Sequence, residues 1–235
     1  MCIFLKLFSM TDRYLYNAKL AEQAERFDDM AEWMTQCVAA RDGPLSEEQR
    51  GALSVAFKNA VGTRRASWRV IAAVEAKEKS NFSETERLAV QFREQVESEI
   101  RALCMNILGM LETRLIPSAT TGKVPLLKMR GDYYRYLSEI SQDPNLPKKA
   151  LASYEEAAAI AQVTLEAADS ARLALALNRS VFYFEIMKDR ENACKVARAA
   201  FEAATAAEVE KQRDAALILQ LLRDNLTLWT SGVFS

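Results

Sequence analysis

Positively charged side chains recur at helical spacing in two parts of the sequence. Lys58, Arg65 and Arg69 stand at positions i, i+7 and i+11 of a stretch that reads as the middle of a long helix. At about 100° per residue, these three cations fall within roughly 20° of one line along that helix. Lys128 and Arg135 repeat the seven-residue spacing further along the chain. Like charges stacked in this way repel one another and need an anion to share, and a phosphate group suits the planar fork of arginine and the point charge of lysine.

The composition indicates an all-helical protein and argues against several classes of function. Only 7 glycines and 5 prolines occur in 235 residues, of which 50% are hydrophobic. The net charge is −1, from 31 basic and 32 acidic residues, so we expect no nucleic-acid partner. The chain has no histidine, which removes the commonest general base and metal ligand. We therefore expect no catalytic residues, no metal and no cofactor.

The cysteines and the N-terminal stretch indicate where in the cell the protein resides. Cys2, Cys37, Cys104 and Cys194 show no CxxC spacing, which is typical of reduced thiols in an intracellular protein. The apolar start MCIFLKLFSM is short, is interrupted by Lys6 and is followed by no small-residue cleavage site. We expect neither a signal peptide nor a membrane span, no membrane partner, and a soluble cytoplasmic protein.

Helix signals divide the chain into nine segments, an all-α array of antiparallel neighbours. We expect helices near residues 11–24, 28–41, 47–79, 84–113, 126–141, 148–165, 170–188, 190–207 and 210–230, with a loop from Pro117 to Pro125. A Thr or Asp cap opens the first helix, Ser46 and Gln49 form a capping box before the third, and Ser83 and Glu86 repeat this pattern before the fourth. No shift in composition indicates two independent domains.

Two later helices carry apolar stripes edged by amides. Leu177 and Val181 form an i, i+4 pair beside Asn178 and Glu185, which are seven residues apart. Leu217, Leu221 and Leu228 span about 40° of the last helix, where Asn225 follows Ile218 by seven residues.

Facing the cationic helices, these two helices would line an amphipathic trough. By itself, however, an apolar stripe is more often part of a core, and a Lys/Arg stripe is more often a solvated face. Spacing alone does not bring the four helices together.

Four blocks of sequence resemble the signature blocks of the 14-3-3 family. They are RRASWRV at 64–70, LKMRGDYYRYL at 127–137, LALNRSVFYFEI at 175–186 and LLRDNLTLW at 221–229. The stretch AKLAEQAERFDDMAEWM at 18–34 is similar to the first two helices of the family, and the match extends over about residues 12–231. The resemblance implies a cup-shaped protomer of nine antiparallel helices with an amphipathic groove. It also implies a homodimer or heterodimer that binds phosphoserine and phosphothreonine motifs of client proteins without catalysis.

The resemblance also implies site residues. The phosphate would be bound by Lys58, Arg65, Arg135 and Tyr136, with Arg69 and Lys128 nearby. The peptide would be bound by Leu177, Asn178, Val181, Glu185, Leu217, Ile218, Leu221, Asn225, Leu228 and Trp229. The dimer interface would contain Leu20, Ala24, Arg26, Ser67, Val70, Val74, Phe92 and Glu99, with an ion pair between Arg26 and Glu99 of different protomers. The domain would cover residues 12–231, between a flexible N-terminal extension at 1–11 and a short tail at 232–235.

Two positions qualify the resemblance. Arg179 stands where the family usually has an aromatic residue, and we expect it to add a charge near the ligand. Ser67 follows Arg64 and Arg65 in a pattern typical of a basic-directed kinase site, and a family serine here loosens the dimer when phosphorylated. The competing interpretation of Ser67, a small serine that packs between helices, is the one we favour.

Two other classes of function remain as alternatives. One is a helical-repeat scaffold or chaperone-like holder that binds unphosphorylated peptide through the apolar wall. The other is an enzyme, which the absence of histidine, of a glycine-rich phosphate loop and of a nucleophile constellation argues against.

Overall fold

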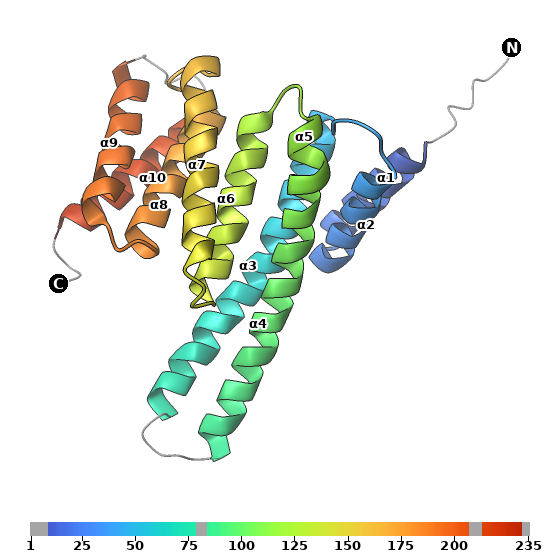
Figure 1. Ribbon diagram of the computed structural model, residues 1–235, viewed down its shortest axis with the longest axis vertical. Coiled ribbons are helices and arrows are strands. Elements are labelled where there is room, and N and C mark those ends of the chain that lie inside the picture. The colour runs from blue at the N-terminus through green and yellow to red at the C-terminus, as the bar shows by residue number, and fades with distance from the viewer. Residues whose placement is uncertain (1–8, 79–83, 207–212, 232–235) are drawn as a thin grey trace, which may run out of the picture. The chain divides into compact units, whose positions relative to one another are not determined.

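A computed structural model of the chain describes residues 9–78, 84–206 and 213–231, and it contains helices and connecting turns but no strand in these ranges. The chain divides into two compact units, Met1–Thr120 and Thr121–Ser235 (Figure 1). Within the described ranges, no helix combines the length and the apolarity that crossing a membrane requires.

The first unit is built around a long pair of helices. Its elements are α1 (Met10–Gln23), α2 (Phe27–Ala39), α3 (Glu47–Glu78), α4 (Glu84–Met110), a π-helical turn (Leu111–Leu115) and α5 (Ile116–Ser118). Helices α3 and α4 run side by side, and α1 and α2 pack against each other and against α3 (Figure 1). Met30, Met34, Leu53, Phe57 and Ile100 are fully buried in this unit, so the apolar faces of α2, α3 and α4 form its core.

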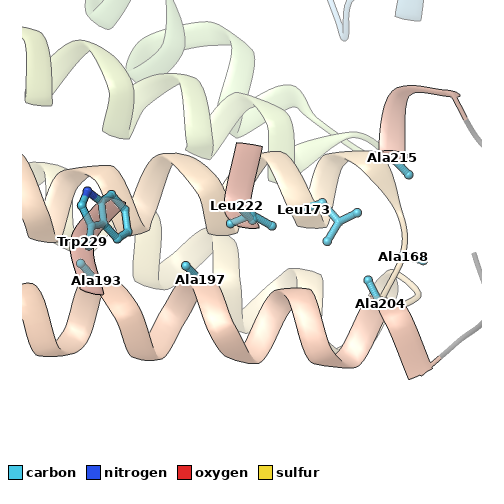
Figure 2. Packing of buried hydrophobic residues seen from close by; sticks show 8 residues of the cluster. All are labelled: Ala168, Leu173, Ala193, Ala197, Ala204, Ala215, Leu222 and Trp229. Carbon is cyan, nitrogen blue, oxygen red and sulfur yellow. The ribbon is translucent and has the colours of Figure 1, made fainter. Parts of the chain in front are cut away.

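The second unit contains five helices. They are α6 (Lys123–Glu139), α7 (Asn145–Thr164), α8 (Ser170–Glu185), α9 (Arg190–Ala206) and α10 (Arg213–Thr230). Helix α6 packs on α7, and α8 packs on both α9 and α10. Figure 2 shows the cluster that joins the last three helices, in which Leu173 and Leu222 lie among the small side chains of Ala193, Ala197 and Ala204. Because alanine has only a methyl group, α9 approaches its neighbours closely.

The predicted number of helices is confirmed in the part of the chain that the structure describes. Helix α4, the π-helical turn and α5 form one continuous run, since the residues flanking the turn, Met110 and Ile116, both have right-handed helical backbone. Counted as one, this run and the other elements make nine helices.

The predicted loop from Pro117 to Pro125 and the predicted start of the helix near residues 148–165 are wrong. The helical run continues to Ser118, and α6 begins at Lys123 with Pro125 in its first turn. Helix α7 begins at Asn145, not 148, with Pro147 in its first turn. Proline is tolerated there because the first N–H groups of a helix have no acceptor within it, and the fixed φ of proline already suits a helix.

The helix caps confirm one prediction and correct another. The Ser46 N–H donates to the Gln49 side chain (3.0 Å), and the Gln49 N–H donates to the Ser46 hydroxyl (3.2 Å), which is the predicted capping box. The predicted Thr or Asp cap of the first helix is wrong, because Ser9 caps α1 and Asp12 completes a capping box with it. Ser83, the predicted cap of α4, lies outside the described residues.

Candidate functional site

The carboxylate of Asp132 is the centre of a buried polar network in the second unit. Helix α6 places Lys128, Asp132 and Arg135 within two turns of one another. Asp132 Oδ2 accepts a hydrogen bond from Lys128 Nζ at 2.8 Å. Its Oδ1 accepts one from the Tyr154 hydroxyl on α7 at 2.7 Å and one from Asn178 Nδ2 on α8 at 2.8 Å. One carboxylate therefore ties together three helices.

The guanidinium of Arg135 is buried beside this carboxylate. Its Nε donates to the Tyr154 hydroxyl at 3.3 Å, and its Nη2 lies 3.8 Å from Asp132 Oδ1. The carbon of the guanidinium lies 4.7 Å from the ring centre of Tyr136, at cation–π distance. Arg135 is thus fixed by groups from its own helix and from α7, so it is held in place before any ligand arrives.

Two further carboxylates approach Arg135 at longer range. Nη1 of Arg135 lies 3.5 Å from Glu139 and 3.8 Å from Glu185. The Glu185 side chain is almost half exposed, so it can turn toward solvent at little cost and leave this edge of the guanidinium to an incoming anion.

Burial and charge act in opposite directions on the pKa values of this network. Burial by itself raises the pKa of Asp132, but the charges of Lys128 and Arg135 and the hydrogen bonds from Lys128 and Tyr154 outweigh it, so that the pKa lies below its ordinary value. Burial, followed by the charge of Asp132, raises the pKa of Tyr154 well above its ordinary value. The network at neutral pH therefore holds an ionised Asp132 and a neutral, donating Tyr154.

Gly131 makes room for Tyr154. A Cβ atom at Gly131 would lie 2.6 Å from Cε1 and 2.7 Å from Cδ1 of the Tyr154 ring, closer than carbon atoms approach. A glycine at this position of α6 therefore lets the ring approach the helix closely, with its hydroxyl at the Asp132 carboxylate.

Five of the predicted site residues come together in this network, although they belong to two separate blocks of sequence. They are Lys128, Arg135, Tyr136, Asn178 and Glu185.

The sequence interpretation missed Asp132, Glu139 and Tyr154. The spacing of Asp132, four residues after Lys128 and three before Arg135, is a signal for ion pairs along a helix and would have identified it. Tyr154 comes from another helix, and no spacing rule connects it to α6.

The predicted apolar stripe of α10 faces solvent. The exposed fractions of Leu217, Leu221 and Leu228 are 62%, 43% and 44%, whereas Leu222, on the other side of the helix, is fully buried. The interpretation of this stripe as core is therefore wrong. The predicted wall residues Leu177, Val181 and Ile218 are partly buried against the cluster of Figure 2, and Asn225 is partly buried.

Trp229 is buried at the end of the same cluster. Its ring stacks on Phe184 of α8 with 4.8 Å between centroids. This stacking fixes the last turn of α10 against α8.

The first unit carries the remaining predicted cations on α3. Lys58 and Arg69 are exposed and Arg65 is partly buried. Helix α3 is continuous from Glu47 to Glu78, so the three side chains do share one helix, as predicted.

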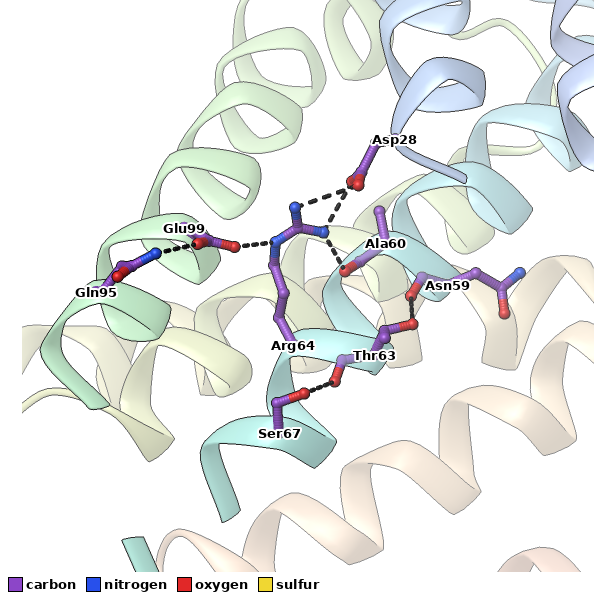
Figure 3. A network of polar contacts seen from close by, with 8 residues as sticks. All are labelled: Asp28, Asn59, Ala60, Thr63, Arg64, Ser67, Gln95 and Glu99. Carbon is purple, nitrogen blue, oxygen red and sulfur yellow. Dashed lines mark hydrogen bonds and ion pairs between the residues drawn. The ribbon is translucent and has the colours of Figure 1, made fainter. Parts of the chain in front are cut away.

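Arg64, the neighbour of Arg65, is a structural residue. Figure 3 shows its guanidinium bridging three helices: Nη1 donates to Asp28 of α2 at 2.8 Å, and Nε donates to Glu99 of α4 at 2.8 Å. Burial lowers the pKa of Arg64, but hydrogen bonds to both carboxylates reverse this effect and raise it, so Arg64 is charged at all relevant pH values.

The residues predicted for the dimer interface lie on the surface of the first unit. Leu20, Val70, Val74 and Phe92 are large, apolar and exposed, and Ala24 and Ser67 are exposed as well. Arg26 and Glu99 are paired within the chain, with Asp29 and Arg64 respectively, so an ion pair across a dimer would require both to exchange partners.

Comparison with known proteins identifies the family. Residues 17–230 match the family model of the 14-3-3 protein. The chain is 46% identical to 14-3-3-like protein F of Nicotiana tabacum, over 96% of this chain and 92% of the relative. It is 48% identical to 14-3-3 protein epsilon of Drosophila melanogaster, over 95% and 90%, and 47% identical to 14-3-3 protein beta/alpha of Xenopus tropicalis, over 91% of each.

The chain therefore belongs to the 14-3-3 family. Proteins of this family are regulatory adaptors rather than enzymes. Membership supports a protein that binds client proteins and forms dimers.

Proposed function

We propose that this protein binds phosphoserine and phosphothreonine motifs of client proteins, and that Lys58, Arg65, Arg135 and Tyr136 bind the phosphate. The observation that carries the proposal is the buried Arg135, which is held by Asp132 and Tyr154 next to an amide, Asn178, on the same network. A fixed guanidinium fork beside a hydrogen-bonding amide suits a phosphorylated residue in an extended peptide, because the fork binds phosphate oxygens and the amide binds peptide backbone.

The energetics of this arrangement favour a phosphorylated ligand over a plain one. A phosphate carries a charge of about −1.5 to −2 at pH 7, and each charge-assisted hydrogen bond contributes roughly 1.5–3 kcal/mol. An unphosphorylated serine offers one hydroxyl and no charge, so it cannot form these charge-assisted hydrogen bonds.

The exposed leucines of α10 supply the remainder of the proposed site. Leu217, Leu221 and Leu228 leave a stripe of apolar surface uncovered, which is costly unless a ligand covers it. We assign the peptide flanking the phosphate to this stripe, together with Leu177, Val181 and Ile218, and we assign Glu185, Asn225 and Trp229 to orienting that peptide.

Peptide binding tests the proposal directly. A phosphoserine peptide library is passed over the immobilised full-length protein, and the best binder is then titrated by calorimetry beside its unphosphorylated form. We expect the plain peptide to bind at least about 100-fold more weakly, a difference of about 2.7 kcal/mol. Equal affinities would overturn the proposal and favour a holder of unphosphorylated peptides.

We further propose that the protein acts in the cytoplasm as a homodimer, and that the same surface would serve a heterodimer with a related chain. Exposed apolar side chains on α1, α3 and α4 support this proposal. Surface ion pairs contribute little, so apolar contacts would supply most of the affinity. Two binding sites on one body would make the second contact intramolecular and raise avidity by about 10²–10⁴.

Sedimentation velocity of the wild-type protein and of Val70→Glu tests the dimer. Val70 is exposed and has no role in the core, so the variant should fold and sediment as a monomer while the wild type sediments as a dimer. A monomeric wild type at micromolar concentration would refute this part of the proposal.

A further inference from the structure

A cavity of about 410 Å³ lies among α7, α8 and α9 of the second unit. It is separate from the proposed peptide site, because Leu177, Asn178 and Val181 do not line it. Consecutive residues of a helix point about 100° apart, so α8 directs Asn178 toward the Asp132 network and Arg179 toward this cavity.

The charges at the cavity all have one sign. Arg172 and Arg179 of α8 and Lys195 of α9 line it, and no aspartate or glutamate is among its described lining residues. One amino group of Arg172 donates to the backbone oxygen of Leu165 at 2.9 Å, which orients this guanidinium without neutralising its charge. Three cations that share a concave surface attract anions and repel one another when it is empty.

The Nε atom of Arg179 is an independent observation that points to an anionic ligand. It is buried, and it has no hydrogen-bond partner among the described residues. The guanidinium carbon of Arg179 lies 5.7 Å from the ring centre of Tyr183, at cation–π distance. The aromatic ring stabilises the charge but does not supply a conventional hydrogen-bond acceptor for Nε. A buried N–H group without an acceptor is destabilising, and a bound anion would accept its hydrogen bond and remove this cost.

Apart from Gln162, Asn192 and Tyr183, the remaining residues that line the cavity are apolar. Ala167 lies between α7 and α8, and the other alanines come from the three helices: Ala158, Ala161, Ala176, Ala199, Ala200 and Ala203. Short side chains leave room for a flat or compact hydrocarbon group, and Leu173, Leu175 and Val196 complete the apolar surface.

We propose that this cavity binds a small organic anion, with its acidic group at Arg179, Arg172 and Lys195 and its apolar body against the alanines. The site includes neither the residues to which we assign phosphate binding nor the dimer surface. The outcome of its test is therefore independent of the proposed function.

A pair of fluorescent probes tests the proposal. The anion 8-anilinonaphthalene-1-sulfonate and its uncharged analogue N-phenyl-1-naphthylamine share an apolar body and differ in the sulfonate. Each is titrated into the full-length protein and into variants Arg179→Phe, Lys195→Gln and Arg198→Ala. Arg198 lies on α9 but does not line the cavity, so Arg198→Ala controls for a general loss of positive charge.

We expect the anion to bind with a stoichiometry of one per chain and to bind at least about tenfold more weakly to Arg179→Phe. Lys195→Gln should weaken it about threefold, and Arg198→Ala should leave it within about twofold of the wild type. Circular dichroism establishes that each variant is folded, and Arg179→Gln replaces Arg179→Phe if the phenylalanine variant fails to fold.

Two outcomes would overturn the proposal. If the uncharged analogue binds as tightly as the anion, the cavity selects only for apolar character. If the substitution of Arg179 leaves the affinity for the anion unchanged, the probe binds elsewhere.

Discussion

The hydroxyl group of Tyr154 donates a 2.7 Å hydrogen bond to Asp132, and both residues are buried. The same hydroxyl accepts a hydrogen bond from Arg135 at 3.3 Å. Tyr154 therefore connects the carboxylate and the guanidinium of α6 through a single atom on α7, and it positions the residue to which we assign phosphate binding.

Tyr154→Phe removes this atom and keeps the ring. We expect the free energy of unfolding to fall by about 1–3 kcal/mol, because Arg135 loses an acceptor and Asp132 loses a donor in a buried site. Urea denaturation measures the change. Tyr16→Phe, at an exposed position of α1, is the control and should change stability by less than about 0.5 kcal/mol. Equal stabilities of the two variants would show that the network contributes nothing.

Asp132→Asn should be more destabilising, by about 3–5 kcal/mol at pH 7, because Lys128 and Arg135 lose their shared charge inside the protein. The side-chain amide introduced by the substitution also places an N–H donor next to one of the two cations, which have no acceptor for it. Urea denaturation at pH 7 compares the variant with the wild type, and a loss below about 1 kcal/mol would contradict the assignment of Asp132 as the centre of the site.

The pKa of Asp132 predicts a pH dependence as well. Since the folded-state pKa lies below the ordinary value of 3.8, the unfolded chain binds the proton more readily. The stabilisation is fully present above the unfolded pKa and is lost as the pH falls through the folded pKa. Stability curves between about pH 7 and pH 2 should therefore fall more steeply below about pH 4 for the wild type than for Asp132→Asn. Parallel curves would count against this prediction.

Two glycine substitutions should have opposite signs. Gly131→Ala drives a methyl group into the Tyr154 ring, and we expect a loss of about 1–3 kcal/mol. Gly51→Ala on α3 meets no atom within 4 Å and should stabilise the protein by about 0.5–1 kcal/mol, since alanine is the better helix former. Thermal denaturation distinguishes the two. A stabilising Gly131→Ala would mean that the ring moves aside freely.

Lys58→Glu and Arg135→Ala should separate binding from stability. Lys58 is exposed, so its substitution should weaken phosphopeptide binding at least about tenfold and change the free energy of unfolding by less than about 0.5 kcal/mol. Arg135→Ala should abolish measurable binding and also destabilise the protein by about 1–3 kcal/mol, because Asp132 and Tyr154 lose a partner. Calorimetry and urea denaturation of both variants provide the test, and near-normal affinity in either would contradict the proposed phosphate site.

Ser67→Glu should loosen the proposed dimer. The Ser67 hydroxyl donates to the Thr63 backbone oxygen at 3.1 Å (Figure 3). Ser67 is exposed on α3, three residues before Val70. A negative charge at this position of an apolar interface should raise the dimer dissociation constant at least about tenfold, whereas Ser67→Ala should leave it unchanged. Analytical ultracentrifugation compares the two variants. A tight Ser67→Glu dimer would show that phosphorylation of Ser67 does not control dimerisation.

The number and order of the helices were predictable because their apolar periodicity is long and their caps are local. The capping box of Ser46 and Gln49 depends on residues three apart, and spacing is sufficient to find it. The errors at Pro125 and Pro147 have one cause: proline ends a helix in its interior but is accepted in its first turn, and sequence alone did not say which turn each would occupy.

The site residues were predictable where their spacing within a single helix identifies them. Lys128 and Arg135 were visible as a stripe, and Asn178 as the amide beside an apolar pair. Tyr154 was not visible, because its role comes from packing against Gly131, a contact between α6 and α7 that only the folded chain creates.

The bridge made by Arg64 bears on how readily Ser67 can be modified. Its guanidinium is occupied by Asp28 and Glu99, and Ser67 itself lies in the middle of a continuous helix. A kinase that recognises basic residues in an extended substrate could bind this segment only after α3 unwinds locally and the ion pairs of Arg64 with Asp28 and Glu99 break. The rate of modification would then report the local opening of α3 more than the abundance of the enzyme.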